Sequence, residues 1–348
     1  MKKPRVGDWL EVRSKEEILA TLDKKGRMEE LPFMPQMFQF CGQRFPVYKR
    51  AHKTCDWVYT VRSRWLPNGI HLDLRCDGEA YGGCKAGCLI YWKEAWLKPV
   101  KGPNESAVRR EQGAKSTAPP LEHTNSSGCT EADVLEGTHE EAGSGETKYI
   151  CQGTHLPNFT KPISRWDVRQ YWEDYTSGNV TIGTMFRGFI YAGYFKLITA
   201  GIGLGPPLRW LYDKFQVLWG GIPYPRRSGP IPAGQPTPKS DLNLQPGDLV
   251  RVKSYQEILT TLDTKGMNHG LSFDAEMVPY CGGTYRVRSL LDKFIDEKTS
   301  KLITMKKPCI ILEKVWCQSR YSQCRMFCSR SIYSWWHDIW LERVREDA

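Results

Sequence analysis

The sequence predicts an α+β protein in which two small SH3-like β-barrel units flank a helical, aromatic-rich middle segment. Three observations lead to this prediction: an internal repeat, short alternating strand patterns in both copies, and many aromatic residues between them. The chain has 348 residues, of which 40% are hydrophobic and 25% are charged. These proportions are typical of a globular protein of about two domains, and they exclude collagen-like, rod-like and wholly disordered chains.

The internal repeat is the strongest organisational signal. Residues 7–47 align with residues 247–287 without a gap, at a constant offset of 240 positions. By direct count, 18 of these 41 positions are identical, whereas chance would give roughly two or three. One structural unit is therefore predicted to occur twice, in residues 1–100 and in residues 245–348.

Within each copy the pattern predicts short strands and one helix. In the second copy, residues 249–252 alternate as a strand does, and Ser254 is placed to cap a helix over residues 255–262. In the second copy, a hairpin is predicted from strands at residues 284–296 and 301–315. The strand that closes each unit is predicted at residues 96–100 in the first copy and at residues 340–344 in the second. Short strands, one helix and a Gly-Asp opening favour a small SH3-like barrel for each unit.

Three segments separate the two units. Residues 101–147 hold four Lys/Arg and nine Asp/Glu and no aromatic residue, which predicts a flexible acidic linker. Residues 148–220 are predicted to be helical and aromatic-rich, and the proline-rich residues 221–244 a spacer. Helices in the middle segment are predicted at residues 166–175, 182–199 and 208–219.

Charge is distributed unevenly along the chain. The net charge is +10, and because residues 101–147 contribute −5, the remainder carries +15. A cationic folded part attracts anionic partners such as nucleic acid, acidic polysaccharide or lipid headgroups. The same charge also fits an ordinary solvated surface, so it does not select one of these partners.

The aromatic middle segment admits three interpretations. It is core that packs against the two units, a peripheral membrane element through residues 166–219, or a groove for a partner protein or polymer. The longest apolar stretch, residues 188–204, is interrupted by Lys196, so no transmembrane span is predicted. Because the N-terminal residues lack an apolar signal region, the expected location is cytoplasmic.

Four cysteines recur at matching places in the two copies. They are Cys41, Cys76, Cys84 and Cys88 in the first copy, and Cys281, Cys317, Cys324 and Cys328 in the second. Zn²⁺ prefers four tetrahedral ligands and binds thiolates well, and four protein ligands leave no position open for substrate. The sequence therefore predicts two structural zinc ions per chain. Iron–sulfur clusters, buried free thiols and disulfides remain as alternatives.

Two further cysteines have neighbours that invite a chemical interpretation. Cys55 lies in the run His52-Lys53-Thr54-Cys55-Asp56, where a nearby base could activate its thiol, although an incidental cysteine in a surface loop is the more common case. Cys151 and His155 are four residues apart and would share a helix face. A lone pair of this kind occurs more often by chance than as a metal site.

Several strings carry a family resemblance. GDLVRVKSYQEILTTLD, PYCGGTYRV, CQSRYSQCRMFC and HLDLRCDGEAYGGCKAGCLIYWKEAWL resemble a bacterial protein family with a duplicated cysteine-rich, SH3-like unit. The resemblance covers both units and residues 201–225. It implies a bacterial cytosolic protein and supplies no catalytic residue.

These patterns favour a binding protein over an enzyme, because no nucleophile or acid–base motif is recognisable. The predicted function is a metal-stabilised scaffold, with two all-cysteine zinc sites, that binds a protein or an anionic polymer. The first alternative is a nucleic-acid-binding protein, suggested by the cationic folded part. The second is an iron–sulfur or thiol-dependent redox enzyme, suggested by the cysteines.

Overall fold

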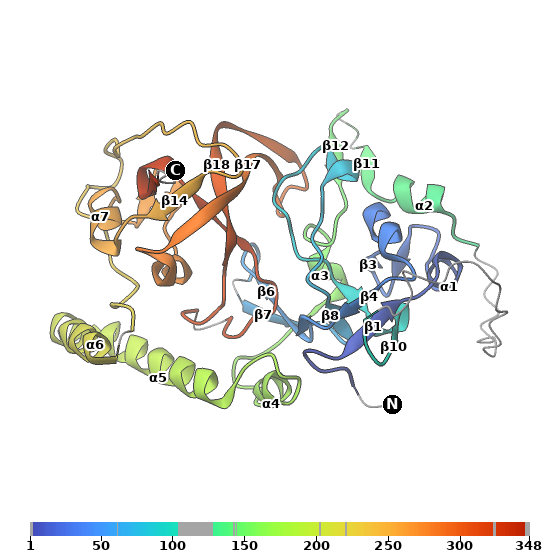
Figure 1. The fold of residues 1–348 in the computed structure, drawn as a ribbon, viewed down its shortest axis with the longest axis horizontal. Helices are drawn as coiled ribbons and strands as arrows, with labels where there is room; N and C mark the ends of the chain where they lie inside the picture. Colours follow the sequence, from blue (N-terminus) through green and yellow to red (C-terminus); the bar gives the residue numbers. More distant parts are fainter. Residues whose placement is uncertain are drawn as a thin grey trace.

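The computed structural model describes residues 3–60, 62–103, 128–141, 143, 145–201, 203–219, 221–322 and 325–344. Short strands form small sheets in two neighbouring bodies, which correspond to the two copies of the repeat (Figure 1). Three helices of the middle segment run along one edge of the molecule, below both bodies (Figure 1). The chain is therefore a mixed α+β protein, as predicted.

Unit 1 (residues 1–100) is built from short strands and single helical turns. Its strands are β1 (Trp9–Val12), β2 (Arg27–Met28), β3 (Leu31–Pro32), β4 (Arg44–Pro46), β5 (Lys49–Arg50), β6 (Lys53–Asp56), β7 (Arg62–Trp65), β8 (Gly69–His71), β9 (Trp92–Lys93) and β10 (Leu97–Pro99). Its helices are α1 (Lys15–Leu19) and the 3-10 turns η1 (Pro35–Phe40), η2 (Glu79–Tyr81) and η3 (Glu94–Trp96). The strands pair in the orders β10-β1-β4, β5-β8-β9 and β2-β3, while β6 pairs with β7, and β7 pairs in addition with a strand from the middle segment.

Unit 2 (residues 245–348) has longer strands. They are β14 (Leu249–Val252), β15 (Met267–Asn268), β16 (Leu271–Ser272), β17 (Thr284–Ile295), β18 (Leu302–Trp316), β19 (Tyr333–Trp336) and β20 (Leu341–Arg343). Its helices are α7 (Tyr255–Thr260), η4 (Ala275–Tyr280) and η5 (Asp338–Trp340). One sheet runs in the order β19-β18-β17-β14-β20, so the predicted hairpin and closing strand are confirmed.

The repeat is visible in the backbone pairing. Strand β1 lies between β10 and β4, and β14 lies between β20 and β17, antiparallel in every case. Leu10 faces Phe45 and Val250 faces Tyr285, which preserves the offset of 240 on both strands. The described strands form open sheets and do not close into a barrel, so the SH3-like prediction is not confirmed.

Side chains at repeated positions also make the same contacts. A capping box formed by Ser14 and Glu17 starts α1, and Ser254 and Glu257 start α7 in the same way. The indole nitrogens of two buried tryptophans each donate to a threonine hydroxyl at 3.0 Å. These pairs are Trp96 with Thr21 and Trp340 with Thr261. The duplication therefore extends from sequence to packing.

Each unit has its own aromatic core. In unit 1, Phe33 meets Trp96 edge to face with ring centroids 5.2 Å apart. In unit 2, Phe273 meets Trp340 at the same 5.2 Å. Both tryptophans are fully buried. Edge-to-face pairs of this kind add to the stabilisation that burial of the rings provides.

The middle segment contributes two kinds of structure. Near unit 1 lie α2 (Glu131–Glu136), β11 (His139–Glu141), β12 (Thr147–Tyr149), α3 (Leu156–Phe159) and β13 (Lys161–Pro162). They are followed by α4 (Arg169–Thr176), α5 (Ile182–Ile198) and α6 (Gly205–Trp219), close to the predicted ranges. None of these or the other described helices is long and apolar enough to cross a membrane.

The prediction of a flexible linker over residues 101–147 needs correction in part. Residues 128–147 include α2, which is capped by Thr130 and buries Val134 against Gly26 of unit 1. The low average hydrophobicity of the segment concealed this short capped helix. The remainder of the linker prediction, residues 104–127, lies outside the described residues.

Candidate functional site

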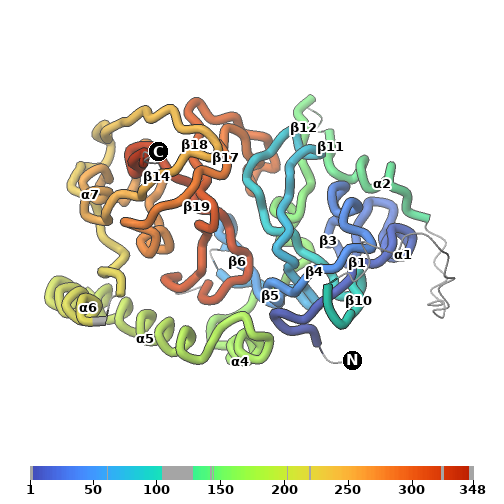
Figure 2. The backbone as a smooth tube through the Cα atoms, in the orientation of Figure 1, coloured from blue at the N-terminus to red at the C-terminus, as the bar shows by residue number. Residues whose placement is uncertain are grey.

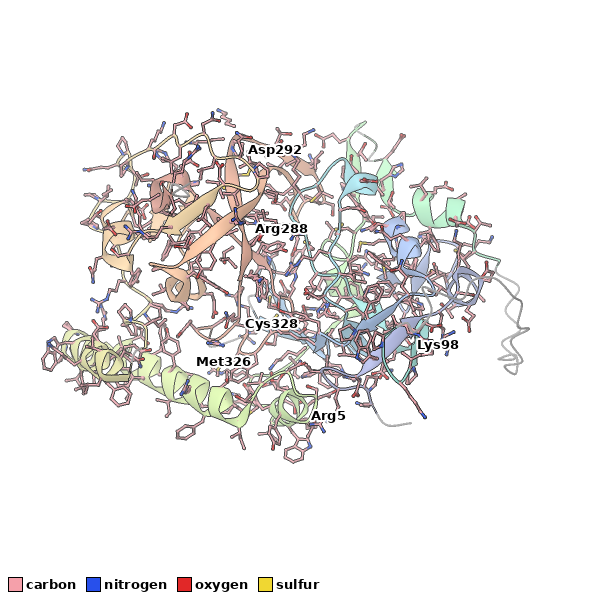
Figure 3. The ribbon with its side chains drawn as sticks, viewed as in Figure 1. Arg5, Lys98, Arg288, Asp292, Met326 and Cys328 are labelled. Atoms are coloured by element: carbon pink, nitrogen blue, oxygen red, sulfur yellow. The ribbon has the colours of Figure 1, made fainter. Side chains whose placement is uncertain are left out.

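The two units meet along a contact surface, here called the seam, that is rich in cysteine and arginine. Ser329 of unit 2 donates from its backbone and its hydroxyl to the carbonyl of Lys53 in β6, the latter at 2.9 Å. Lys85 of unit 1 pairs with Asp292 on β17 at 2.9 Å. Figures 2 and 3 show β19 and Cys328 in the region where the two bodies approach one another.

Three of the four predicted ligands of unit 1 line one cavity at the seam. Cys76, Cys84 and Cys88 border a cavity of about 30 Å³. That volume is enough for one or two water molecules, or for one ion. Ile295 and Arg330 of unit 2 complete its wall, so the cavity belongs to both units.

The local backbone explains why these three cysteines meet. The Cys76 amide donates to the Cys88 carbonyl at 2.9 Å, which joins the two ends of the loop. Within the loop, Gly78 has a φ of +77°, and a Cβ atom on it would lie 1.8 Å from the carbonyl oxygen of Cys84. Only glycine allows so close an approach with this backbone conformation.

Substitution of Gly78 by alanine should therefore lower the free energy of unfolding by more than the backbone strain alone would. Gly83 is a matched control, because its φ is +78° but a Cβ atom on it would have nothing within 4 Å. We expect Gly83→Ala to lower the free energy of unfolding by about 1 kcal/mol and Gly78→Ala by at least about 2 kcal/mol. Chemical denaturation of both variants measures the difference, and equal losses would contradict the close packing at Gly78.

The fourth predicted ligand, Cys41, does not line this cavity. The charged groups close to its thiol are Lys15, Glu16 and Glu131, and burial raises the pKa of Cys41. A cysteine without a counterpart in the repeat takes part instead: Cys151 borders the cavity together with Cys76, Cys84 and Cys88. The cavity is thus lined by four cysteines, three of which were predicted.

Cys151 is held in place by its neighbours in the sequence. Gln152 donates to the carbonyls of Pro32 and Tyr91 and accepts from the Tyr91 amide, at 2.8–2.9 Å. His155, which the spacing placed on a helix face with Cys151, pairs with Glu30 at 3.2 Å. Cys151 and Cys76 are each followed by a glycine two residues later, and this Cys-x-Gly pattern could have identified Cys151 as a site residue. The pattern is not specific, because Cys281 has it as well.

The predicted ligands of unit 2 are placed differently. Cys281 follows η4 in the unit 2 core, and burial raises its pKa to about 12. Cys317 and Cys328 lie near each other and near Cys55 of unit 1. Cys324 lies outside the described residues. The described part of this quartet is thus divided between the core and the seam.

Cys55 and Cys328 form a buried thiol pair across the seam. Their side chains share a hydrogen bond, which raises the pKa of Cys55 well above its usual range. Burial alone would raise the pKa of Cys328, but the bond from Cys55 and the Arg330 amide lower it to about 6. Cys55 is 6% exposed, and its raised pKa disfavours the thiolate that a nucleophile needs.

The bases expected beside Cys55, His52 and Lys53, contact Asp174 instead. His52 Nε2 lies 3.0 Å from Asp174 Oδ1 on α4, and Lys53 Nζ lies 2.5 Å from Oδ2 of the same carboxylate. All three side chains are at most 1% exposed. The contacts of Asp174 with Lys53 and His52 fasten α4 to unit 1. They were not predicted because Asp174 lies in a segment without a repeat partner.

No group of three or more histidine, cysteine, aspartate or glutamate side chains in the described ranges is arranged to hold a metal ion. The zinc and iron–sulfur assignments therefore stay predictions. The chemistry that the thiols and the buried cation at the seam allow is binding of a soft metal or oxidation of a thiol pair.

A second distinctive surface lies on α4–α6. We call residues 166–219 the helical arm. Of twenty exposed large hydrophobic side chains among the described residues, fifteen lie on the arm. The other five are Val6, Trp57, Tyr59, Leu135 and Ile303. A concentration of exposed apolar side chains on one part of a protein marks a site of interaction with another protein or a membrane.

Cations are interspersed among these apolar side chains. Lys196 lies 5.0 Å from the ring of Trp166, and Lys214 lies 5.8 Å from the ring of Trp210. Residues 182–219 contain two arginines, these two lysines and one aspartate, a net charge of +3. That aspartate, Asp213, pairs with Arg227, so the exposed surface of α5 and α6 is cationic as well as apolar.

The arm is attached firmly along its other face. Gly188 of α5 packs against unit 2, where a Cβ would lie 2.7 Å from Phe327 and 2.9 Å from Met326. Figure 3 shows Met326 above α5. A groove of about 810 Å³ runs between α5, α6 and unit 2, and its wall includes Tyr191 and Tyr321, whose rings are 5.0 Å apart.

No protein-family model matches the chain, and no curated protein matches it significantly.

Proposed function

We propose that this protein is a scaffold that attaches to the surface of an anionic membrane through the helical arm. The observation that carries the proposal is the concentration of exposed apolar side chains on α4–α6, interspersed with lysine and arginine. The arm would lie in the plane of the membrane surface, since no described helix is suited to span the bilayer.

The composition of the arm matches what a lipid interface requires. Trp172 and Trp210 are 69% and 61% exposed, and tryptophan is favoured where an apolar environment meets water. Leu218, at 82%, and Val217, at 78%, supply apolar area that burial among the acyl chains would remove from water. Lys196 and Lys214 would add electrostatic attraction of about 1 kcal/mol each near anionic headgroups.

Attachment of the arm would fix the position of both units. The cluster of Asp174 with Lys53 connects α4 to unit 1, and the contact of Gly188 with Phe327 connects α5 to unit 2. A membrane bound on the exposed face of the arm would therefore leave the bulk of both repeated units facing away from it, where they are available to a partner. This division of roles is what we mean by a scaffold.

Co-sedimentation of the full chain with vesicles tests the proposal. We expect binding to vesicles of phosphatidylcholine with 30% phosphatidylglycerol and at least tenfold weaker binding to phosphatidylcholine alone. The double variant Trp210→Glu/Leu218→Glu should lose at least tenfold in affinity for the anionic vesicles. The matched control Trp57→Glu/Tyr59→Glu changes two exposed aromatic residues outside the arm and should bind normally.

Two results would overturn the proposal. One is equal binding by both double variants, because the arm would then not be the attachment site. The other is a dimer that depends on Trp210 and Leu218 in the absence of vesicle binding, because the apolar face would then serve self-association. Circular dichroism of each variant confirms that it is folded.

A further inference from the structure

The cavity at the seam gathers four thiols from two separate parts of the chain. Cys76, Cys84 and Cys88 come from the loop around η2, and Cys151 comes from the segment between β12 and α3. All four side chains are partly buried. The remaining wall is largely apolar, and Arg330 is its one charged residue.

Backbone amides are already directed at two of these sulfurs. The Gly78 N–H donates to Cys76 Sγ, and the N–H groups of Gly153 and Thr154 donate to Cys151 Sγ. Gln36 donates a further hydrogen bond to Cys76 Sγ at 3.1 Å. Donors of this kind stabilise a thiolate more than a neutral thiol, and they orient sulfur ligands around a metal.

Nearby charge also suits a thiolate site. Arg330 is 3% exposed and lies on the wall of the cavity together with the four thiols. Arg330 pairs with Glu297 of unit 2. A zinc ion with four thiolates carries a net charge of −2, so a buried guanidinium beside it reduces the cost of burial.

We propose that Cys76, Cys84, Cys88 and Cys151 bind one zinc ion at the seam, with Cys151 in the place that the repeat assigned to Cys41. The four cysteines line one cavity, but their side chains as described are not yet grouped closely enough to hold a metal ion. Each thiol is positioned by rotation about a single side-chain bond, so binding needs side-chain rotation and closure of the cavity around the ion.

Binding has a proton balance that can be measured. A cysteine thiol with an ordinary pKa is mostly protonated at neutral pH, and Zn²⁺ binds the thiolate form, so protons must leave the thiols as the ion enters. Affinity is therefore expected to fall steeply as the pH is lowered.

The decisive comparison is between Cys151→Ser and Cys41→Ser in the full chain. After chelation and reduction, wild-type protein incubated with zinc and desalted should retain one ion per chain at this site, measured by elemental analysis. Cys151→Ser should lose at least tenfold in zinc affinity, measured by competition with a chromophoric chelator. Cys41→Ser, also a partly buried cysteine, should bind as the wild type does.

A measurement on the unaltered chain covers the case in which Cys151→Ser fails to fold. Zinc should protect Cys76, Cys84, Cys88 and Cys151 from alkylation, as mapped by mass spectrometry, and should leave Cys41 reactive. Protection of Cys41 in place of Cys151 would restore the quartet of the repeat and overturn the proposal. Absence of zinc binding by the reduced wild type would overturn it as well. The arm variants should keep their zinc, so this test is independent of membrane attachment.

Discussion

Replacement of Asp174 by asparagine is expected to lower the free energy of unfolding by about 3 to 5 kcal/mol. The carboxylate is fully buried and accepts a hydrogen bond from Lys53 Nζ at 2.5 Å. Lys53 is itself 0% exposed, so loss of the negative charge leaves a buried ammonium without its counter-ion. Urea or guanidinium denaturation monitored by tryptophan fluorescence measures the change.

Two comparisons separate the burial of this charge from other effects. Asp167→Asn removes a carboxylate just before the same helix, but its partner Arg169 is 85% exposed, so it should lower the free energy of unfolding far less than Asp174→Asn does. The double variant Asp174→Leu/Lys53→Met removes both buried charges and should recover most of the stability. If the double variant is as unstable as Asp174→Asn, the unpaired lysine is not the cause.

The consequence should extend to the arm. Asp174 lies on α4, and the neighbouring Glu173 contacts Arg50 of unit 1 at 3.3 Å. These contacts hold the beginning of the arm against unit 1, so Asp174→Asn should increase amide hydrogen exchange in α4 before it does so in β14. The arm therefore depends on unit 1 for its position.

The repeat allowed much of the fold to be predicted, because a repeated pattern carries its local structure with it. The capping boxes at Ser14 and Ser254 and the hairpin of β17 and β18 depend on residues close in sequence or on pairing that the pattern determines. The three helices of the arm followed from the positions of their apolar residues and from the glycines that separate them. Closure of each unit into a barrel depends on strand contacts that the local pattern does not determine.

The candidate site was predicted only in part, for a physical reason. Alignment of two copies identifies residues that correspond, whereas a site consists of residues that lie close together. Cys41 and Cys281 correspond, but neither lines the cavity at the seam. Cys151 and Arg330 line this cavity, and the repeat has no matching residue for either of them. A seam between two copies is made by different surfaces of each, so residues unique to one copy are expected there.

The local spacing of the cysteines was the more reliable signal. Cys84 and Cys88 are separated by three residues, and the loop that carries them is closed by the backbone bond between Cys76 and Cys88. Such a loop brings its sulfurs together without help from the remainder of the chain. The fourth sulfur must come from a distant segment, and its identity depends on the tertiary fold.

Acid should destabilise the protein through His71, which is fully buried in β8 beneath the seam. Burial is the main cause that lowers the pKa of His71 to about 3, and the charges of Lys49 and Arg75 lower it further. Its Nδ1–H donates to the Ile90 carbonyl at 2.8 Å, which the neutral ring can do. A protonated ring would add another cation to a seam that already holds several.

The direction of the pH effect follows from the two pKa values. In the unfolded chain histidine binds a proton below about pH 6.5, whereas in the folded protein His71 does so only near pH 3. Between these values the unfolded state binds more protons, so stability falls as the pH is lowered, by about 1.4 kcal/mol per pH unit. Above pH 6.5 the contribution of His71 is complete and constant.

His71→Phe isolates this contribution, because it keeps an aromatic ring and removes the titration. The variant loses the bond to Ile90 and should be less stable at pH 7, but its stability should depend less on pH. Between pH 6.5 and 4.5 the wild type should lose roughly 2 to 3 kcal/mol more than the variant. His337, whose pKa burial lowers to about 4, contributes to both curves and cancels in the difference. If the curves of stability against pH for the wild type and the variant run parallel over this range, His71 is protonated in the folded protein. The cations at the seam would then tolerate one more positive charge.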